Sequence, residues 1–211
     1  MLKLALTTCF FIAVSQCASA RPVSYAGGWT LIEETNRQST RGLIHYTPNR
    51  FYSLGLRADW DRQDDIFFVG PQATWLAKRW FGEDHQANLY FWGAAGLADE
   101  DGSDGSSFGS QIGTIADWET RRLFLSYRAS ARYYEGIDKT FSQSLRLGVA
   151  PYLGDSGDLH TWLMVELDNR PDNPEPLGIT PLIRLFYNSA LFEAGWSLTD
   201  NQPLINFQYR F

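Results

Sequence analysis

Five charged residues in the second half of the chain, Arg128, Arg132, Arg146, Glu166 and Asp168, are candidates for ordering ions or charged solutes. Charged side chains that surround a water-filled passage tune which ions pass through it. The same side chains can also pair with one another and brace or fill a narrow space. Which of the two they do depends on the elements that hold them and on the faces they share.

The segment 123–134 shows which element holds two of these arginines. Its odd positions from Leu123 to Tyr133 are apolar or aromatic, while Arg128 and Arg132 lie among the even positions. A helix would spread the apolar residues around its whole circumference, whereas a strand collects them on one face. The alternation therefore predicts a strand with both arginines on its polar face.

The same alternation recurs in twelve segments separated by turn residues, and no helical stretch with a credible cap interrupts them. Segments of about ten alternating residues are typical of transmembrane β-barrels. We therefore expect an all-β fold, a closed antiparallel barrel of twelve strands, with ten as the fallback because the first two segments are the least regular. The segments are 28–35, 41–47, 52–60, 66–80, 87–97, 108–118, 123–134, 140–152, 158–168, 177–187, 191–198 and 203–211.

Alternate residues of such a barrel point into its lumen, which here is expected to be polar and charged. The basic residues on the inward face are Arg57, Lys78, Arg128, Arg132, Arg146, Arg184 and Arg210. The acidic ones are Asp59, Asp117, Glu166, Asp168 and Glu193. Strict alternation also turns Gln143 outward. Pro71, Pro151 and Pro181 fall inside the segments, so we expect bulges or strand ends at those positions.

The first twenty residues form a predicted secretory signal peptide, with Lys3 before an apolar run and Ala-Ser-Ala before Arg21. Lipoprotein processing at Cys17 is disfavoured by the glutamine that precedes it. The mature chain, residues 21–211, is then one barrel domain without cysteine and with a formal charge of −7, because removal of Lys3 lowers the whole-chain value of −6. An acidic exported chain is not expected to bind nucleic acid. An aromatic content of 15% suits the interfacial girdles of a membrane barrel.

The junctions between segments differ in charge from one rim to the other. Five junctions of one rim hold twelve Asp and Glu against three Lys and Arg, and both chain ends belong to the other rim. The acidic rim is expected to face outward. In the run "DEDGSDG", Asp99, Asp101 and Asp104 have the spacing of a loose calcium loop, but the downstream Glu of an EF-hand is missing. This run is either a solvated acidic rim or a place where divalent cations bridge to lipopolysaccharide.

Taken with the final "FQYRF", these features resemble Gram-negative outer-membrane β-barrel proteins over the whole mature chain. Such barrels typically end in a strand with a C-terminal Phe or Trp that the barrel-assembly machinery recognises, and Ile205, Phe207, Tyr209 and Phe211 match that pattern. The resemblance implies the bacterial outer membrane, with its lipid and lipopolysaccharide as surroundings. A soluble β-sandwich or periplasmic barrel would also alternate, but it does not account for uncharged outward faces such as 123–133.

Three functions stay open at this point. The leading hypothesis is a narrow channel for small hydrophilic solutes or ions, without cofactor, in which Arg57, Arg128, Arg132, Arg146, Glu166, Asp168, Arg184 and Arg210 line the lumen and tune selectivity. The alternative is a non-conducting structural or surface-interaction barrel with acidic outer loops. The third is a lipid-modifying enzyme around His160, with Ser144 as the nearest serine. Lipid-A deacylase barrels carry His-x-Ser where this chain has "HTW", so a lumen His160 paired with Glu166 is the competing interpretation and no enzyme is expected.

Overall fold

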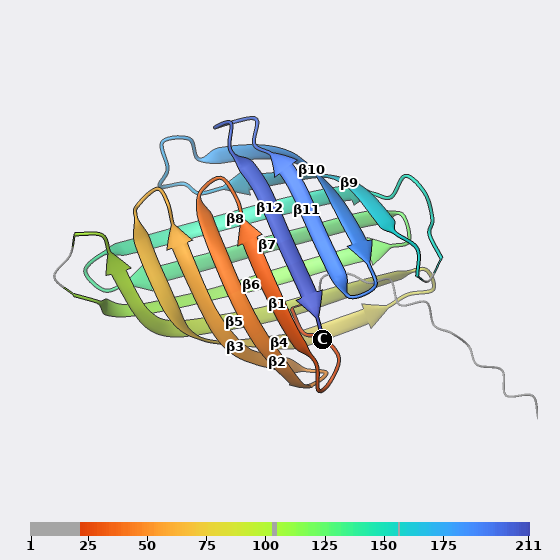
Figure 1. Cartoon of the computed structure of the whole chain (residues 1–211), viewed down its shortest axis with the longest axis horizontal. Helices are drawn as coiled ribbons and strands as arrows, with labels where there is room; N and C mark the ends of the chain where they lie inside the picture. The colour runs from red at the N-terminus through yellow and green to blue at the C-terminus, as the bar shows by residue number, and fades with distance from the viewer. Residues whose placement is uncertain (1–21, 103–104, 156) are drawn as a thin grey trace, which may run out of the picture.

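Twelve strands close into one antiparallel barrel in the computed structural model of the chain, which describes residues 22–102, 105–155 and 157–211 (Figure 1). The predicted signal peptide and Asp104 lie outside the described residues. The predicted fold class and strand number are confirmed. The strands are β1 (Trp29–Thr35), β2 (Ser39–Asn49), β3 (Tyr52–Asp61), β4 (Ile66–Phe81), β5 (His85–Glu100), β6 (Ser107–Thr120), β7 (Leu123–Tyr134), β8 (Asp138–Val149), β9 (His160–Asn169), β10 (Leu177–Tyr187), β11 (Ala190–Trp196) and β12 (Pro203–Arg210).

The pairing of β12 with β1 closes the barrel and orders the C-terminal strand up to its last residue. The two strands pair from Thr30 opposite Arg210 to Thr35 opposite Ile205. The N–H of Trp29 donates to the carbonyl of Phe211 at 2.8 Å, and the N–H of Phe211 donates back at 3.1 Å. In lipid an unpaired strand edge is costly, so closure satisfies the backbone groups of both terminal strands.

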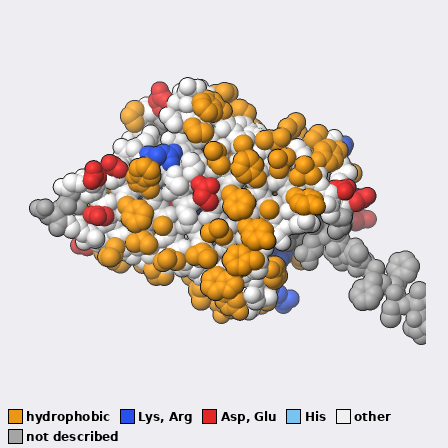
Figure 2. Space-filling view, viewed as in Figure 1, with side chains coloured by type: hydrophobic (Ala, Val, Ile, Leu, Met, Phe, Trp, Pro, Cys, Tyr) orange, Lys and Arg blue, Asp and Glu red, His pale blue; other side chains and the backbone are white. Residues whose placement is uncertain are grey.

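The outward faces of the barrel are apolar and aromatic. Large hydrophobic side chains are exposed on all twelve strands, and Figure 2 shows them covering much of one side of the molecule, with charged groups mainly toward its two ends. The inward faces carry the buried polar and charged residues. This arrangement fits a barrel surrounded by lipid. Among the described residues, no helix is long and apolar enough to cross a membrane.

Of the three prolines in the predicted strands, only Pro151 lies at a strand end, as expected. Pro151 lies beyond the end of β8, and the pairing of β10 with β11 begins at Leu182, directly after Pro181. The paired positions of β4 and β5 are interrupted within 69–72, around Pro71. Pro71 and Pro181 lie inside their strands and stay paired on the other side, with Leu56 on β3 and Val165 on β9, without a register shift. The bulges predicted at these two prolines are therefore wrong.

A bulge in β4 overturns one predicted lumen residue. The register of β4 against β5 shifts between Leu76 and Lys78, and one extra residue turns the side chains that follow to the other face. Lys78 is exposed, so its predicted inward position is wrong. The neighbouring Arg79 takes that place, and its Nε donates to Oδ1 of Asn88 at 2.6 Å.

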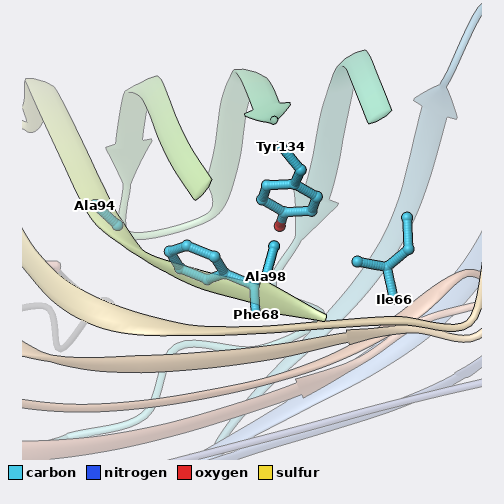
Figure 3. Close-up of a cluster of buried hydrophobic side chains, with 5 residues drawn as sticks. All are labelled: Ile66, Phe68, Ala94, Ala98 and Tyr134. Carbon is cyan, nitrogen blue, oxygen red and sulfur yellow. The ribbon is translucent and has the colours of Figure 1, made fainter. Parts of the chain in front are cut away.

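The barrel has two rims, a terminal rim and a loop rim. The terminal rim holds both ends of the barrel and the turns after β2, β4, β6, β8 and β10, whereas the loop rim holds the other connections. Toward the loop rim, an inward apolar cluster of Ile66, Phe68, Ala94, Ala98 and Tyr134 fills one side of the lumen (Figure 3). The rings of Phe68 and Tyr134 stack at 5.5 Å. The lumen is therefore not polar throughout.

Candidate functional site in the barrel lumen

A salt bridge crosses the middle of the lumen. Arg128 on β7 binds Glu34 on β1 through Nη1 and Oε1 at 2.8 Å. These two strands are six apart in a ring of twelve, so they stand on opposite walls. Arg41 on β2 binds the second oxygen of Glu34, also at 2.8 Å. The arginine side chains keep 30% and 32% exposure, and the group of three carries one net positive charge inside the lumen.

Arg57 is held against the wall next to this bridge. Its Nε donates to Asp59 at 2.5 Å and its Nη1 to Gln72 at 3.1 Å, while the guanidinium lies 4.4 Å from the ring centre of Trp92. Asp59 also accepts from Arg41 at 3.2 Å. Arg57 is only 4% exposed. It therefore anchors the bridging group and does not offer a free charge to the passage.

A second charged group braces the wall from β8 to β12. Glu193 on β11 accepts from Arg146 at 2.8 Å, from Arg184 at 2.6 Å and from Asn206 at 2.5 Å. Arg146 also binds Glu166, its direct cross-strand neighbour. Two arginines thus face two glutamates, and the group is neutral. A buried network is favourable only when its members are paired in this way.

A third charged group crosses the lumen at the loop rim. Arg170, just after β9, binds Asp61 at the end of β3 at 2.7 Å, and its other nitrogen binds Asp64 at 2.5 Å. Strands β3 and β9 stand opposite each other in the ring. Arg132 on β7 binds Asp61 as well, and Asp64 at 2.9 Å. The connection between β9 and β10 is thereby tied across the mouth.

Arg37, in the connection after β1, reinforces this mouth from another side. Its Nε binds Asp168 at 3.0 Å, its Nη1 binds Asp200 at 3.2 Å, and its Nη2 donates to the carbonyl of Glu175 at 2.8 Å. Burial opposes the charge, but the hydrogen bonds and charges of the two aspartates outweigh it and raise the pKa of Arg37. A Cβ at Gly178 would lie 2.6 Å from Nε of Arg37, so glycine leaves room for this contact.

A cavity of about 230 Å³ lies within the lumen and reaches from the central bridge to the loop-rim group. Its β7–β8 side is lined by small hydroxyl side chains, Ser130, Ser142 and Ser144. The hydroxyls of Ser130 and Ser142 lie 2.9 Å apart. The small side chains leave the space open there. The partly exposed arginines of the central bridge, Arg41 and Arg128, direct N–H donors toward this space.

Of the eight residues predicted to line the lumen and tune selectivity, seven line this cavity. They are Arg57, Arg128, Arg132, Arg146, Glu166, Asp168 and Arg184. Arg210 does not, because it lies opposite Thr30 at the terminal rim. The five charged residues of the second half of the chain do not pair only with one another. Arg146 binds Glu166, whereas Arg128 binds Glu34, Arg132 binds Asp61 and Asp168 binds Arg37.

The described residues of the loop rim do not form a set of ligands for the predicted cation site. Asp99 ends β5 together with Glu100, and the N–H of Asp101 donates to the carbonyl of Asp65 at 3.2 Å. No group of three metal-ligating side chains occurs among the described residues. A cation at this rim stays a prediction, as does the role of Asp104.

The structure separates the residues that an enzyme around His160 would need. Glu166 is six positions further along β9, and Ser144 lies opposite Asp168, eight positions from His160. At about 3.3 Å per residue these separations are roughly 20 Å and 26 Å. The predicted pair of His160 with Glu166 is therefore wrong. The ring of His160 lies beside Phe186, with centroids 6.4 Å apart.

Sequence reasoning missed most of the residues in the charged groups that cross the lumen or tie its mouth. Glu34 and Arg41 fall in the two least regular segments, although strict alternation there would have placed them with the polar residues. Arg37 and Arg170 belong to junctions, where alternation stops and gives no direction for a side chain. Asp61 was assigned to a junction and not to the lumen, yet it is 3% exposed between two arginines.

Comparison with known proteins supports the fold alone. No family model and no curated protein sequence matches the chain. The KdgM porin in complex with disordered oligogalacturonate is similar in structure, with a TM-score of 0.53 and 15% identity over 87% of this chain and 99% of that chain. A second structure of the KdgM porin has a TM-score of 0.49 and 15% identity over 87% and 98%. The chain thus has the twelve-strand closed barrel fold of an outer-membrane porin.

Proposed function

We propose that this protein is an outer-membrane channel for small hydrophilic solutes or ions, with its narrowest level at the bridge between Arg128 and Glu34. The observation that carries the proposal is this bridge between opposite walls, next to a hydroxyl-lined cavity. A charged crossing inside a polar lumen is suited to discriminating among solutes by charge and size. The apolar outer face accounts for the membrane location.

The solute is small and carries few charges. The KdgM porin was solved with oligogalacturonate, which is a polyanion. Here the lumen arginines already face carboxylates, as in the neutral group around Glu193, so an extended polyanion would have to displace them. The single net positive charge of the central bridge favours small anions or neutral polyols that accept hydrogen bonds from Arg41 and Arg128.

Non-conduction is the second candidate, and a specific observation favours it. The same ion pairs that line the lumen also cross it at two levels, the central bridge and the loop-rim group. If both crossings are permanent, the barrel is braced shut and acts as a structural or surface-interaction protein. An enzyme is not proposed, because the strand register separates His160 from Ser144 and Glu166.

Conductance in planar bilayers tests the channel. Wild-type barrel is expected to give discrete current steps. Arg128→Ala removes the transverse bridge and a positive charge, so the step should grow about twofold or more and the reversal potential in a salt gradient should move toward cations. Arg121→Ala makes the same substitution at an exposed position of the β6–β7 turn and should change neither. Folded barrels, verified by heat-modifiable gel mobility, that stay silent for all three proteins would exclude the channel.

Two partners are proposed from the sequence pattern. Phe207 and Tyr209 face outward on β12 and Phe211 follows its end, which is compatible with recognition of this strand by the barrel-assembly machinery. Lipopolysaccharide bridged by divalent cations is the proposed partner of the acidic loop rim. Both proposals follow from the resemblance to outer-membrane barrels.

A further inference from the structure

The segment 22–28, which precedes β1, turns into the lumen at the terminal rim. The N–H of Gly27 donates to the carbonyl of Thr47 at 2.8 Å, and the N–H of Thr47 donates back to Gly28 at 3.0 Å. Upstream of this pairing the chain runs inward, and Pro22 lines the same cavity as the central bridge. Pro22 therefore forms part of the floor of that cavity on the side of the terminal rim.

Val23 is the anchor of this segment. It is 2% exposed and packs with Leu76, Tyr90 and Ile115, which point inward from β4, β5 and β6. Three apolar side chains in the lumen would otherwise face water, because neighbouring inward residues such as Asn88 are polar. Val23 covers these side chains, and its own burial away from water is favourable.

Polar contacts fix the backbone on both sides of Val23. The carbonyl of Pro22 accepts a hydrogen bond from the hydroxyl of Ser53 at 3.0 Å, and Ser53 in turn lies 3.0 Å from Nδ1 of the buried His45. The N–H of Ser24 donates to the hydroxyl of Thr47 at 3.4 Å. Strands β2 and β3 thus hold the segment by hydrogen bonds, while β4, β5 and β6 hold it by apolar packing.

We propose that residues 22–28 form a built-in plug, which closes the lumen at the terminal rim and must leave before a solute can pass. The proposal rests on the proposed channel function, and it adds an obstacle to the two charged crossings, the central bridge and the loop-rim group. Cleavage of the predicted signal peptide would leave one residue, Arg21, ahead of Pro22. Because Val23 is held by apolar packing, a polar substitution at this position should release the segment, whereas a change in salt concentration should hardly affect it.

Cysteine labelling tests whether the plug is seated. The mature chain contains no cysteine, so Val23→Cys and Ser189→Cys each introduce a single thiol. Ser189 is exposed in the β10–β11 turn of the same rim. A membrane-impermeant maleimide should react with position 23 at least about tenfold more slowly than with position 189, since reaction requires the anchor to leave its site. Equal rates in folded barrels would overturn the proposal.

Conductance tests whether the seated plug obstructs the path. Val23→Asp should release the anchor and raise the mean current several-fold over Val23→Ile, which keeps an apolar side chain there. Equal currents from these two conducting barrels would overturn the proposal. If the Val23→Asp, Val23→Ile and Arg128→Ala barrels are all folded and silent, the proposed channel function is excluded, whether or not the segment 22–28 is seated. Labelling, which needs no current, then decides whether the segment is seated, with protection of position 23 as the supporting result.

Discussion

The lumen is obstructed at both ends, and the chemistry of the two ends differs. At the loop rim, charged side chains from opposite walls meet, with Asp61 shared by Arg132 and Arg170. At the terminal rim, the backbone segment 22–28 enters and is held by the apolar packing of Val23 and by uncharged hydrogen bonds to β2 and β3. Ion pairs between partly exposed groups weaken in salt, whereas apolar packing does not. The two ends should therefore respond to different conditions, and a solute of the proposed channel would have to pass both.

The largest effect is expected from removing the carboxylate that two arginines share at the loop rim. Asp61→Ala leaves Arg132 and Arg170 without their buried partner, which typically costs about 3–5 kcal/mol of unfolding free energy. Urea unfolding of the barrel in lipid vesicles, followed by tryptophan fluorescence, measures this change. Asp84→Ala removes a carboxylate with 86% side-chain exposure at the other rim and should stay within about 0.5 kcal/mol of the wild type. A loss for Asp61→Ala no larger than for Asp84→Ala would contradict the buried pairing.

A smaller effect is expected from releasing the β9–β10 connection alone. Arg170→Gln removes the charge that ties this connection to Asp61 and Asp64, while Asp61 keeps Arg132. Charged hydrogen bonds contribute about 1.5–3 kcal/mol, so amide exchange in the peptide 170–176 should become at least tenfold faster. Exchange at 22–28 should not change, because that segment has no ion pair to lose.

The matched control for that experiment is Arg121→Gln in the exposed turn between β6 and β7. Unchanged exchange at 170–176 in Arg170→Gln would show that the connection holds itself in place without the arginine. Faster exchange at both ends would instead show that the two ends open as one unit, and the contrast between them would be lost.

The smallest effect is expected from salt. Raising the salt concentration from 0.1 M to 1 M shortens the Debye length from about 10 Å to about 3 Å. Asp64 keeps 43% side-chain exposure, so its pairs with Arg132 and Arg170 are the ones that salt reaches. Exchange at 170–176 should rise two- to threefold, and the labelling rate of the Val23→Cys barrel should stay constant. A labelling rate at position 23 that depends on salt would mean that charge, and not packing, holds the plug.

Much of the barrel was predictable because one rule, alternation with period two, acts on every strand. It placed the apolar residues of 123–134 outside and Arg128 and Arg132 inside, and it set the strand number. The rule failed at Lys78, where a bulge inserts one residue and the faces exchange. Such a shift depends on the pairing register between β4 and β5, and the sequence of one strand alone does not reveal that register.

The contacts across the lumen were not predictable in the same way. Alternation tells that Arg128 and Glu34 point inward, but their pairing depends on which strands face each other in the closed ring. The residues at the loop rim lie in connections, where no periodicity exists, and Arg170 finds Asp61 across 109 positions of sequence. The packing of Val23 depends on apolar inward residues from three strands, which the sequence does not mark as neighbours.

Modification of a thiol inside the cavity during single-channel recording tests most directly whether the current passes through this lumen. Residues 21–211 contain no cysteine, so after removal of the predicted signal peptide Ser144→Cys places a single thiol on the cavity wall, and Leu147→Cys on the same strand places it outside. A charged methanethiosulfonate reagent should reduce the current step of the first barrel in one discrete event and leave the second unchanged. An unchanged step from a barrel that mass spectrometry shows to be modified at position 144 would contradict conduction past the bridge of Arg128 and Glu34.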